Sequence, residues 1–162
     1  MHKSKDHLQN VQQAVDSIYH LADEKLTQTD RLIFQEDYID TYCKAVYEVL
    51  QNAAESTESA KAAYLRINPN LIKGQKGIYL RRTEEGYFSD YEMTEIPFEE
   101  QGSIESLCWY LEPIAKRTAL WMEPYWDPNV ETYLISYVVP IFFGEIPIGV
   151  VGMDIEVAKL RD

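Results

Sequence analysis

Cysteine is scarce in this chain of 162 residues, and long apolar runs are absent. The two cysteines, Cys43 and Cys108, belong to no CxxC pair. They could form one disulfide, but two small buried residues on helices are the simpler interpretation. No segment reaches the roughly 18 apolar residues of a membrane span, and the first residues lack a signal-peptide pattern. Internal repeats and low-complexity tracts are also missing.

Positive charge is in short supply. Lysine and arginine together number 15 against 27 aspartates and glutamates, which gives a net charge of −12. No Lys/Arg stripe is present to neutralise phosphates, so nucleic acid is excluded as a partner and an anionic membrane surface is disfavoured. A cationic or zwitterionic small molecule suits this charge better.

Catalytic signatures are missing too. The three histidines lie near the start of the chain without the spacing of metal ligands. The sequence holds no GxSxG elbow, no P-loop and no GxGxxG motif. No cofactor and no metal are therefore expected, and an enzyme is the weaker interpretation.

Two stretches in the first third of the chain carry apolar residues at helical spacing. One covers residues 6–26; after an interruption at residues 27–30, the second ends near Ala54. The apolar stripe of the first stretch consists of Leu8, Val11, Val15, Ile18 and Ala22. This narrow stripe could face the core, or it could be the seam of a homodimer formed through the N-terminal helix.

The rest of the chain favours extended structure. Strands are expected at residues 62–67, 77–83, 119–122, 132–143 and 146–155, a weaker one within 87–98, and a helix at 103–117. Gly144-Glu145 suits a two-residue type II′ hairpin turn between the last two strands. One domain with an antiparallel sheet and helices packed against a face is an α+β fold.

The segment PYWDP at residues 124–128 predicts a turn. In one interpretation Asp127 caps its own backbone and the rings fill the core. In the other, the turn is a rim that offers the phenol of Tyr125 and the carboxylate of Asp127 to a ligand.

Asp154 lies near the end of an apolar strand. Burying a carboxylate without a partner is costly, so its position needs a reason. Alternation places it on one sheet face with Ile148, Val150 and Gly152, and the missing side chain of Gly152 would let a group approach the strand closely. Asp154 is therefore either a ligand contact or the N-cap of a following helix.

The pair Trp109-Tyr110 lies on the third predicted helix, where aromatic residues commonly belong to the core. Aromatic faces beside carboxylates also suit an ammonium group. Arg81 and Arg82 alternate faces, so only one of them could reach such a pocket and hold a ligand carboxylate. Surface ion pairs with nearby glutamates are the alternative.

Several segments together resemble one family. They are WYLEPI at 109–114, Trp121, PYWD at 124–127, ISYVVPI at 135–141 and IGVVGMDI at 148–155, preceded by AYLRINP at 63–69 and GIY at 77–79. Their order and spacing resemble the Cache-type sensor domains. These are the PAS-like extracytoplasmic domains of bacterial chemoreceptors, histidine kinases and diguanylate cyclases.

This resemblance implies a Cache fold, with a PAS-like antiparallel sheet and a long N-terminal helix. It divides the chain into an N-terminal helical region (1–60), a ligand-binding core (61–156) and the start of a linker (157–162). It also implies a transmembrane helix before residue 1 and a second, membrane-proximal module after Asp162. The expected location is the extracytoplasmic side of a bacterial cell membrane, where a domain without catalysis of its own relays a signal to a cytoplasmic output domain.

In the amino-acid-binding members, the resemblance implies that the ligand is lined by Trp109, Tyr110, Tyr125, Asp127 and Asp154. Those members hold the ligand carboxylate with an arginine two residues before the tryptophan, where this chain has Leu107. The expected partner is therefore an amine-bearing molecule, among the amines, amino acids and other small metabolites. Two other hypotheses stand beside it: a dimerisation module without a ligand, and a small enzyme that uses Asp127 and Asp154 as an acid/base pair.

Overall fold

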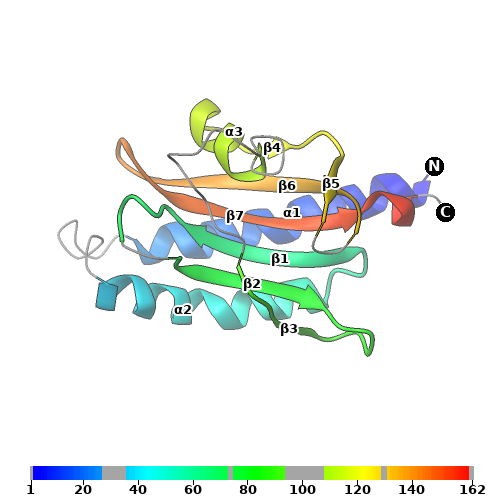
Figure 1. Cartoon of the computed structure of the whole chain (residues 1–162), viewed down its shortest axis with the longest axis horizontal. Coiled ribbons are helices and arrows are strands. Elements are labelled where there is room, and N and C mark those ends of the chain that lie inside the picture. Colours follow the sequence, from blue (N-terminus) through cyan, green and yellow to red (C-terminus); the bar gives the residue numbers. More distant parts are fainter. Residues whose placement is uncertain (1, 27–35, 73–74, 94–107, 129–130, 161–162) are drawn as a thin grey trace.

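The computed structural model describes residues 2–26, 36–72, 75–93, 108–128 and 131–160. Within these ranges one seven-stranded antiparallel sheet packs against α-helices, which confirms the α+β prediction (Figure 1). The helices are α1 (His2–Lys25), α2 (Glu36–Glu55) and α3 (Cys108–Lys116), with a 3-10 helix η3 at Val157–Leu160. The strands are β1 (Ala60–Ile67), β2 (Gly77–Arg82), β3 (Phe88–Asp90), β4 (Leu120–Trp121), β5 (Tyr125–Asp127), β6 (Thr132–Phe143) and β7 (Ile146–Glu156).

The sheet has the strand order β3-β2-β1-β7-β6-β4, and β5 also pairs with β6. Its longest hairpin joins β6 to β7 through Gly144 and Glu145, as the sequence predicts. Gly144 has a φ of 61°, and Glu145 is not among the residues with positive φ. This is the pattern of a type II′ turn, because a type I′ turn needs positive φ at both positions.

One face of the sheet is covered by α1 and α2, which pass behind it in Figure 1. Val11, Val15, Ile18 and Ala22 of α1 are fully buried in this core. The same core takes Ala63 and Leu65 from β1, and Val151, Met153 and Ile155 from β7. The stripe on α1 is therefore used within a single chain, so a dimerisation module that pairs this stripe with its copy has no free stripe to use.

A second, smaller cluster lies on the opposite face of the sheet, beneath α3. Its buried members are Ala62, Tyr64, Tyr79, Trp109, Tyr110, Met122, Val138 and Val150. Cys108 packs against this cluster, whereas Cys43 of α2 packs against the helix-covered core. Both cysteines are free thiols, because the sheet separates them.

A β-bulge in the long hairpin changes which residues share a face. Phe142 pairs with Pro147, but the next pair is Ile141 with Gly149, so Ile148 is the extra residue. Ile148 consequently packs in the helix-covered core, and the prediction that it shares a face with Asp154 is wrong. Gly149 is needed at this point, since a Cβ there would lie 2.1 Å from the carbonyl oxygen of Arg66.

Other expectations from the sequence differ from the structure or concern residues that it does not describe. Residues 125–127 of the PYWDP segment form an edge strand paired with β6, where a turn was expected. The helix predicted from residue 103 is described only from Cys108, and residues 27–30 and 94–98 also lie outside the described residues. Among the helices that are described, none is long and apolar enough to cross a membrane.

Candidate functional site

Asp154 is the buried carboxylate of the face beneath α3. Its position within β7, two residues before the end of the strand, rules out the predicted role as the N-cap of the next helix. The side chain is 3% exposed, and Oδ1 accepts hydrogen bonds from Ser136 Oγ at 2.5 Å and from the Tyr64 hydroxyl at 3.1 Å. Two neutral donors on the neighbouring strands therefore hold one carboxyl oxygen.

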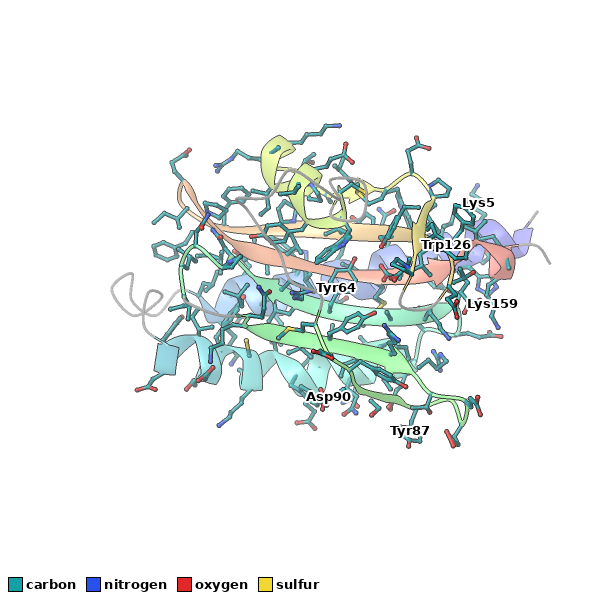
Figure 2. The ribbon with its side chains drawn as sticks, viewed as in Figure 1. Lys5, Tyr64, Tyr87, Asp90, Trp126 and Lys159 are labelled. Carbon is teal, nitrogen blue, oxygen red and sulfur yellow. The ribbon has the colours of Figure 1, made fainter. Side chains whose placement is uncertain are left out.

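Tyr64 reaches Asp154 by crossing the main chain of β7 at Gly152. A Cβ on Gly152 would lie 2.9 Å from the Tyr64 hydroxyl and 2.9 Å from the carbonyl oxygen of Tyr137. The close approach predicted from the missing side chain is thus made by the protein's own phenol. Figure 2 shows Tyr64 near the middle of the sheet, on the face away from α1.

Strand β5 brings Tyr125 and Asp127 to the same site. The Tyr125 hydroxyl lies 2.8 Å from Ser136 Oγ, so Tyr125, Ser136 and Asp154 form a continuous chain of hydrogen bonds. Asp127 is two residues further along β5 and faces the same side as Tyr125. Its negative charge contributes to the raised pKa of Asp154, which places both carboxyl groups in one electrostatic environment.

Helix α3 supplies the aromatic wall. The Trp109 ring meets the Tyr64 ring edge-on, with centroids 5.3 Å apart. Tyr110 is 1% exposed and lies 6.0 Å from Trp109, again edge-on. The structure therefore gathers all five predicted site residues on one face of the sheet, with Tyr110 joined to the group through Trp109.

Burial sets the proton affinity of this site. It raises the pKa of Asp154 to about 7, while hydrogen bonds from Ser136 and Tyr64 act in the opposite direction. Burial also raises the pKa values of Tyr64 and Tyr125 well above their usual range. The phenols therefore stay neutral and donate, and Asp154 exchanges its proton near physiological pH.

Comparison with known proteins identifies the domain. A family profile described as "Methyl-accepting chemotaxis protein-like, first PDC sensor domain" matches residues 46–162. The chain belongs to this family. The predicted resemblance to Cache-type sensors is thereby confirmed. None of the curated proteins matches the sensor domain in sequence.

Solved structures of receptor sensor domains share the fold. The ligand-binding domain of the Campylobacter jejuni chemoreceptor Tlp3, in complex with L-norvaline, has 19% identity and a TM-score of 0.59 over 98% of this chain and 56% of its own. The structure described as the extracellular domain of the histidine kinase soHK1S-Z6 has 18% identity and a TM-score of 0.60. The match covers 97% of this chain and 57% of that structure. The Pseudomonas aeruginosa PAO1 amino acid chemoreceptor PctC, in complex with GABA, has 15% identity and a TM-score of 0.53 over 97% and 60%. The sensor domain thus spans less than two thirds of each of these structures.

The sequence left open which of two arginines faces the site of the sensor domain. Arg81 faces it: Nε donates to the Tyr79 hydroxyl at 3.0 Å, and the guanidinium lies over the rings of Tyr79 and Tyr91. Arg82 instead donates to main-chain carbonyls on the other side. Within the described residues, neither arginine forms a salt bridge with a glutamate, which was the alternative expected from the sequence.

Three residues at the site were not predicted from the sequence: Tyr64, Ser136 and Arg66, whose guanidinium lies over the Trp109 ring. Tyr64 and Arg66 lie in a strand whose residues from Ala62 onward are all buried, so no alternation marked the polar side chains. The role of Ser136 depends on its register opposite Asp154, which the bulge sets. Leu107, at the position where the resemblance to the amino-acid-binding members implies an arginine, lies outside the described residues.

Two hollows lined by described residues lie away from this site. One, of about 250 Å³, lies where β1 and β2 meet η3, beside Lys61, Arg82 and Glu156. The other, of about 440 Å³, follows α1 beside Gln9, Gln12 and Asp16. Neither hollow borders Asp154 or the other four predicted site residues.

Proposed function

We propose that this sensor domain binds a small ligand that carries an ammonium group, and that Asp154 and Asp127 face that group. The rings of Trp109, Tyr110 and Tyr125 would enclose it. Such a ligand would meet two acceptors and aromatic faces, a combination that suits protonated amines.

The observation that carries this proposal is the environment of Asp154. Its carboxyl group is buried, and its hydrogen bonds come from the neutral hydroxyls of Ser136 and Tyr64. Among the described residues, no lysine, arginine or histidine forms an ion pair with it. A buried carboxylate is stabilised when an opposite charge arrives, and an ammonium ligand would provide that charge.

The relatives support the same class of ligand. The Tlp3 domain was solved with L-norvaline and the PctC domain with GABA, and both molecules carry an amine. For this chain the amine is the part that the site favours, because the family's carboxylate-binding arginine is replaced by Leu107.

The wider setting is part of the proposal. We place the sensor domain on the extracytoplasmic side of a membrane-anchored bacterial receptor, with residues 61–156 as the ligand-binding core. Its output domain would be a kinase, a diguanylate cyclase or a methyl-accepting segment. The sensor domain would pair as a homodimer through a face of its N-terminal helix other than the buried stripe. The ligand can drive such an output only by its difference in affinity for the two receptor states.

We propose no catalysis for the domain. Asp127 and Asp154 share one electrostatic environment, so an acid/base pair is the hypothesis against which binding is tested. Mass spectrometry of the ligand after prolonged incubation separates the two: a binding domain returns the ligand unchanged, and an enzyme does not.

Isothermal titration at pH 8 with n-pentylamine, GABA, L-norvaline and pentanoate tests the proposal. We expect at least one amine-bearing compound to bind, pentanoate to fail, and Asp154→Asn to abolish binding while the domain stays folded. Asp90→Asn is the matched control, because Asp90 is exposed at the end of β3 and bonds to Tyr47. Binding of pentanoate alone, or unchanged binding by Asp154→Asn, would refute the assignment.

A further inference from the structure

A buried arginine lies at the other end of the aromatic wall. Arg66 of β1 is 2% exposed, and its guanidinium carbon lies 5.4 Å from the centre of the Trp109 ring. Its Nη2 donates to Oε1 of Gln75 at 3.0 Å. Burial lowers the pKa of Arg66 to about 10, so the side chain still carries its charge at neutral pH.

The strand register gives the spacing between the backbone positions that carry this cation and the acid. Asp154 pairs with Ala62 of β1, and Arg66 pairs with Val150. Both Ala62 and Arg66 are therefore in line with Tyr64 on the face beneath α3. Four residues of strand separate the two positions, which corresponds to about 13 Å at a rise of about 3.3 Å per residue.

Tyr64 lies between the two charged groups. Its hydroxyl contacts Asp154, and its ring packs against Trp109, over which Arg66 lies. The site therefore has an acceptor end, an aromatic middle and a cationic end. A ligand with methylene groups between two opposite charges matches all three parts.

We propose that the ligand is an ω-amino carboxylate and that Arg66 holds its carboxylate. This inference rests on the proposed function, in which Asp154 and Asp127 face the ammonium end. Because the two charged side chains are anchored about 13 Å apart along the strand and Tyr64 lies between them, the charges of the ligand must be separated by several methylene groups. An extended five-carbon chain provides such a separation, and an α-amino acid does not. Arg66 would thus bind the ligand carboxylate, which the apolar side chain of Leu107 cannot do.

Arg81 offers a matched comparison. It also faces this side of the sheet, from the neighbouring strand β2. However, it lies between the rings of Tyr79 and Tyr91, and Tyr91 is 44% exposed. A guanidinium in that wetter position gains less from a carboxylate than a buried one does.

Two isomers and one truncated ligand test the proposal by isothermal titration at pH 8. 5-Aminopentanoate and L-norvaline contain the same atoms with different charge separations, and n-pentylamine lacks the carboxylate. We expect 5-aminopentanoate to bind at least tenfold more tightly than the other two, since a charge-assisted hydrogen bond contributes about 1.5–3 kcal/mol. Arg66→Met should lower the affinity for 5-aminopentanoate to that for n-pentylamine. The affinity for n-pentylamine itself should stay within about threefold of the wild-type value. Arg81→Met should keep the wild-type ratio.

The ratio of the two affinities within one variant separates binding from folding. If Arg66→Met weakens both ligands equally, the arginine has only a structural role and the inference is overturned. A selective loss in Arg81→Met, or a preference for L-norvaline, overturns it as well while leaving the amine site intact. If none of the three compounds binds the folded domain, the proposed function fails together with the inference. Arg66→Lys, which keeps the charge without the fork, should show an intermediate ratio.

Discussion

Ser136 and Asp154 face each other across the long hairpin because of one extra residue. A two-residue turn with Phe143 opposite Ile146 would, without a bulge, place Ser136 opposite Met153. Ile148 shifts the register by one, so that Ser136 meets Asp154 and donates to it at 2.5 Å. Without it Asp154 would lie opposite Ile135, so the bulge decides that a hydroxyl, and not a hydrocarbon side chain, lies beside the buried acid.

The first prediction concerns that hydroxyl. Ser136→Ala removes a donor from a buried carboxyl group and should lower the free energy of unfolding by about 1–3 kcal/mol at pH 8. Ser59→Ala is the control, because Ser59 Oγ is buried and has no hydrogen-bond partner among the described residues. It should change the stability by less than about 0.5 kcal/mol. Urea unfolding measures both, and equal losses would contradict the stabilising role of the Ser136 hydroxyl.

The second prediction follows from the pKa of Asp154, which is about 7 in the fold against an ordinary value of 3.8. The folded state keeps a proton that the unfolded chain releases between these values, so this group's contribution to stability falls as the pH rises towards 7. Asp154→Asn does not titrate and should therefore lose less stability, relative to wild type, at pH 8 than at pH 5. The difference should reach up to about 3 kcal/mol, since pH 5 lies about two units below the folded pKa and one unit corresponds to about 1.4 kcal/mol. Urea unfolding at the two pH values checks it, and a difference that does not change with pH would contradict the raised pKa.

The third prediction couples the same proton to ligand binding. An ammonium group pairs with the ionised form of Asp154, so binding below pH 7 must release the proton. Affinity for n-pentylamine should fall about tenfold for each pH unit below 7 and level off above it. Titration calorimetry in phosphate and in MES, which both buffer at pH 6 and differ in ionisation enthalpy, measures the released proton directly. Equal heats in both buffers at pH 6 would show that the ammonium lies elsewhere.

The regular part of the fold could be predicted because apolar residues that are buried recur in the sequence at helical spacing or form long runs in strands. The apolar stripe of α1, the long runs of β6 and β7 and the glycine turn between them all follow one-dimensional patterns. The strand at Tyr125 has only three residues and is flanked by prolines, so the turn signal was the stronger local feature. Its strand conformation comes from pairing with β6, which no local pattern encodes.

The site was only partly predictable for a similar reason. Asp154 was identified because a carboxylate in an apolar run is unusual, but its partners come from strands about 20 and 90 residues away in sequence. Tyr64 lies in a run of buried residues and looks like core until its neighbour Gly152 is placed. Long-range register, and not residue type, therefore carries the missing information.

The fourth prediction concerns Gly152. Gly152→Ala places a methyl group 2.9 Å from the Tyr64 hydroxyl and from the carbonyl oxygen of Tyr137, so the phenol must move away from Asp154. We expect a loss of about 1–3 kcal/mol, typical of overpacking. The double variant Gly152→Ala/Tyr64→Ala should lose less than the sum of the two single changes, because the clash with the ring disappears. Strict additivity would show that the main-chain contact alone is responsible.

The last prediction concerns Arg82, which joins the end of β2 to the end of α2. Its guanidinium donates to the carbonyl oxygens of Ala54, Thr57, Ala60 and Gly86 at 3.2, 2.8, 2.9 and 2.7 Å. Arg82→Met should reduce the free energy of unfolding by on the order of 3 kcal/mol, since buried carbonyls lose a charged donor. Arg82→Lys should recover little of it, because one ammonium cannot reach acceptors spread around a planar fork.

Arg117→Met is the comparison for that experiment. Arg117 also donates to a carbonyl, that of Gly144, and pairs with Glu145, but both partners lie at an exposed hairpin tip. Its loss should cost less than about 1 kcal/mol, as for other surface ion pairs. Full stability in Arg82→Lys would mean that charge alone is needed at this position. A large loss in Arg82→Met with little recovery in the lysine variant would instead identify the fork geometry as what joins α2 to the sheet.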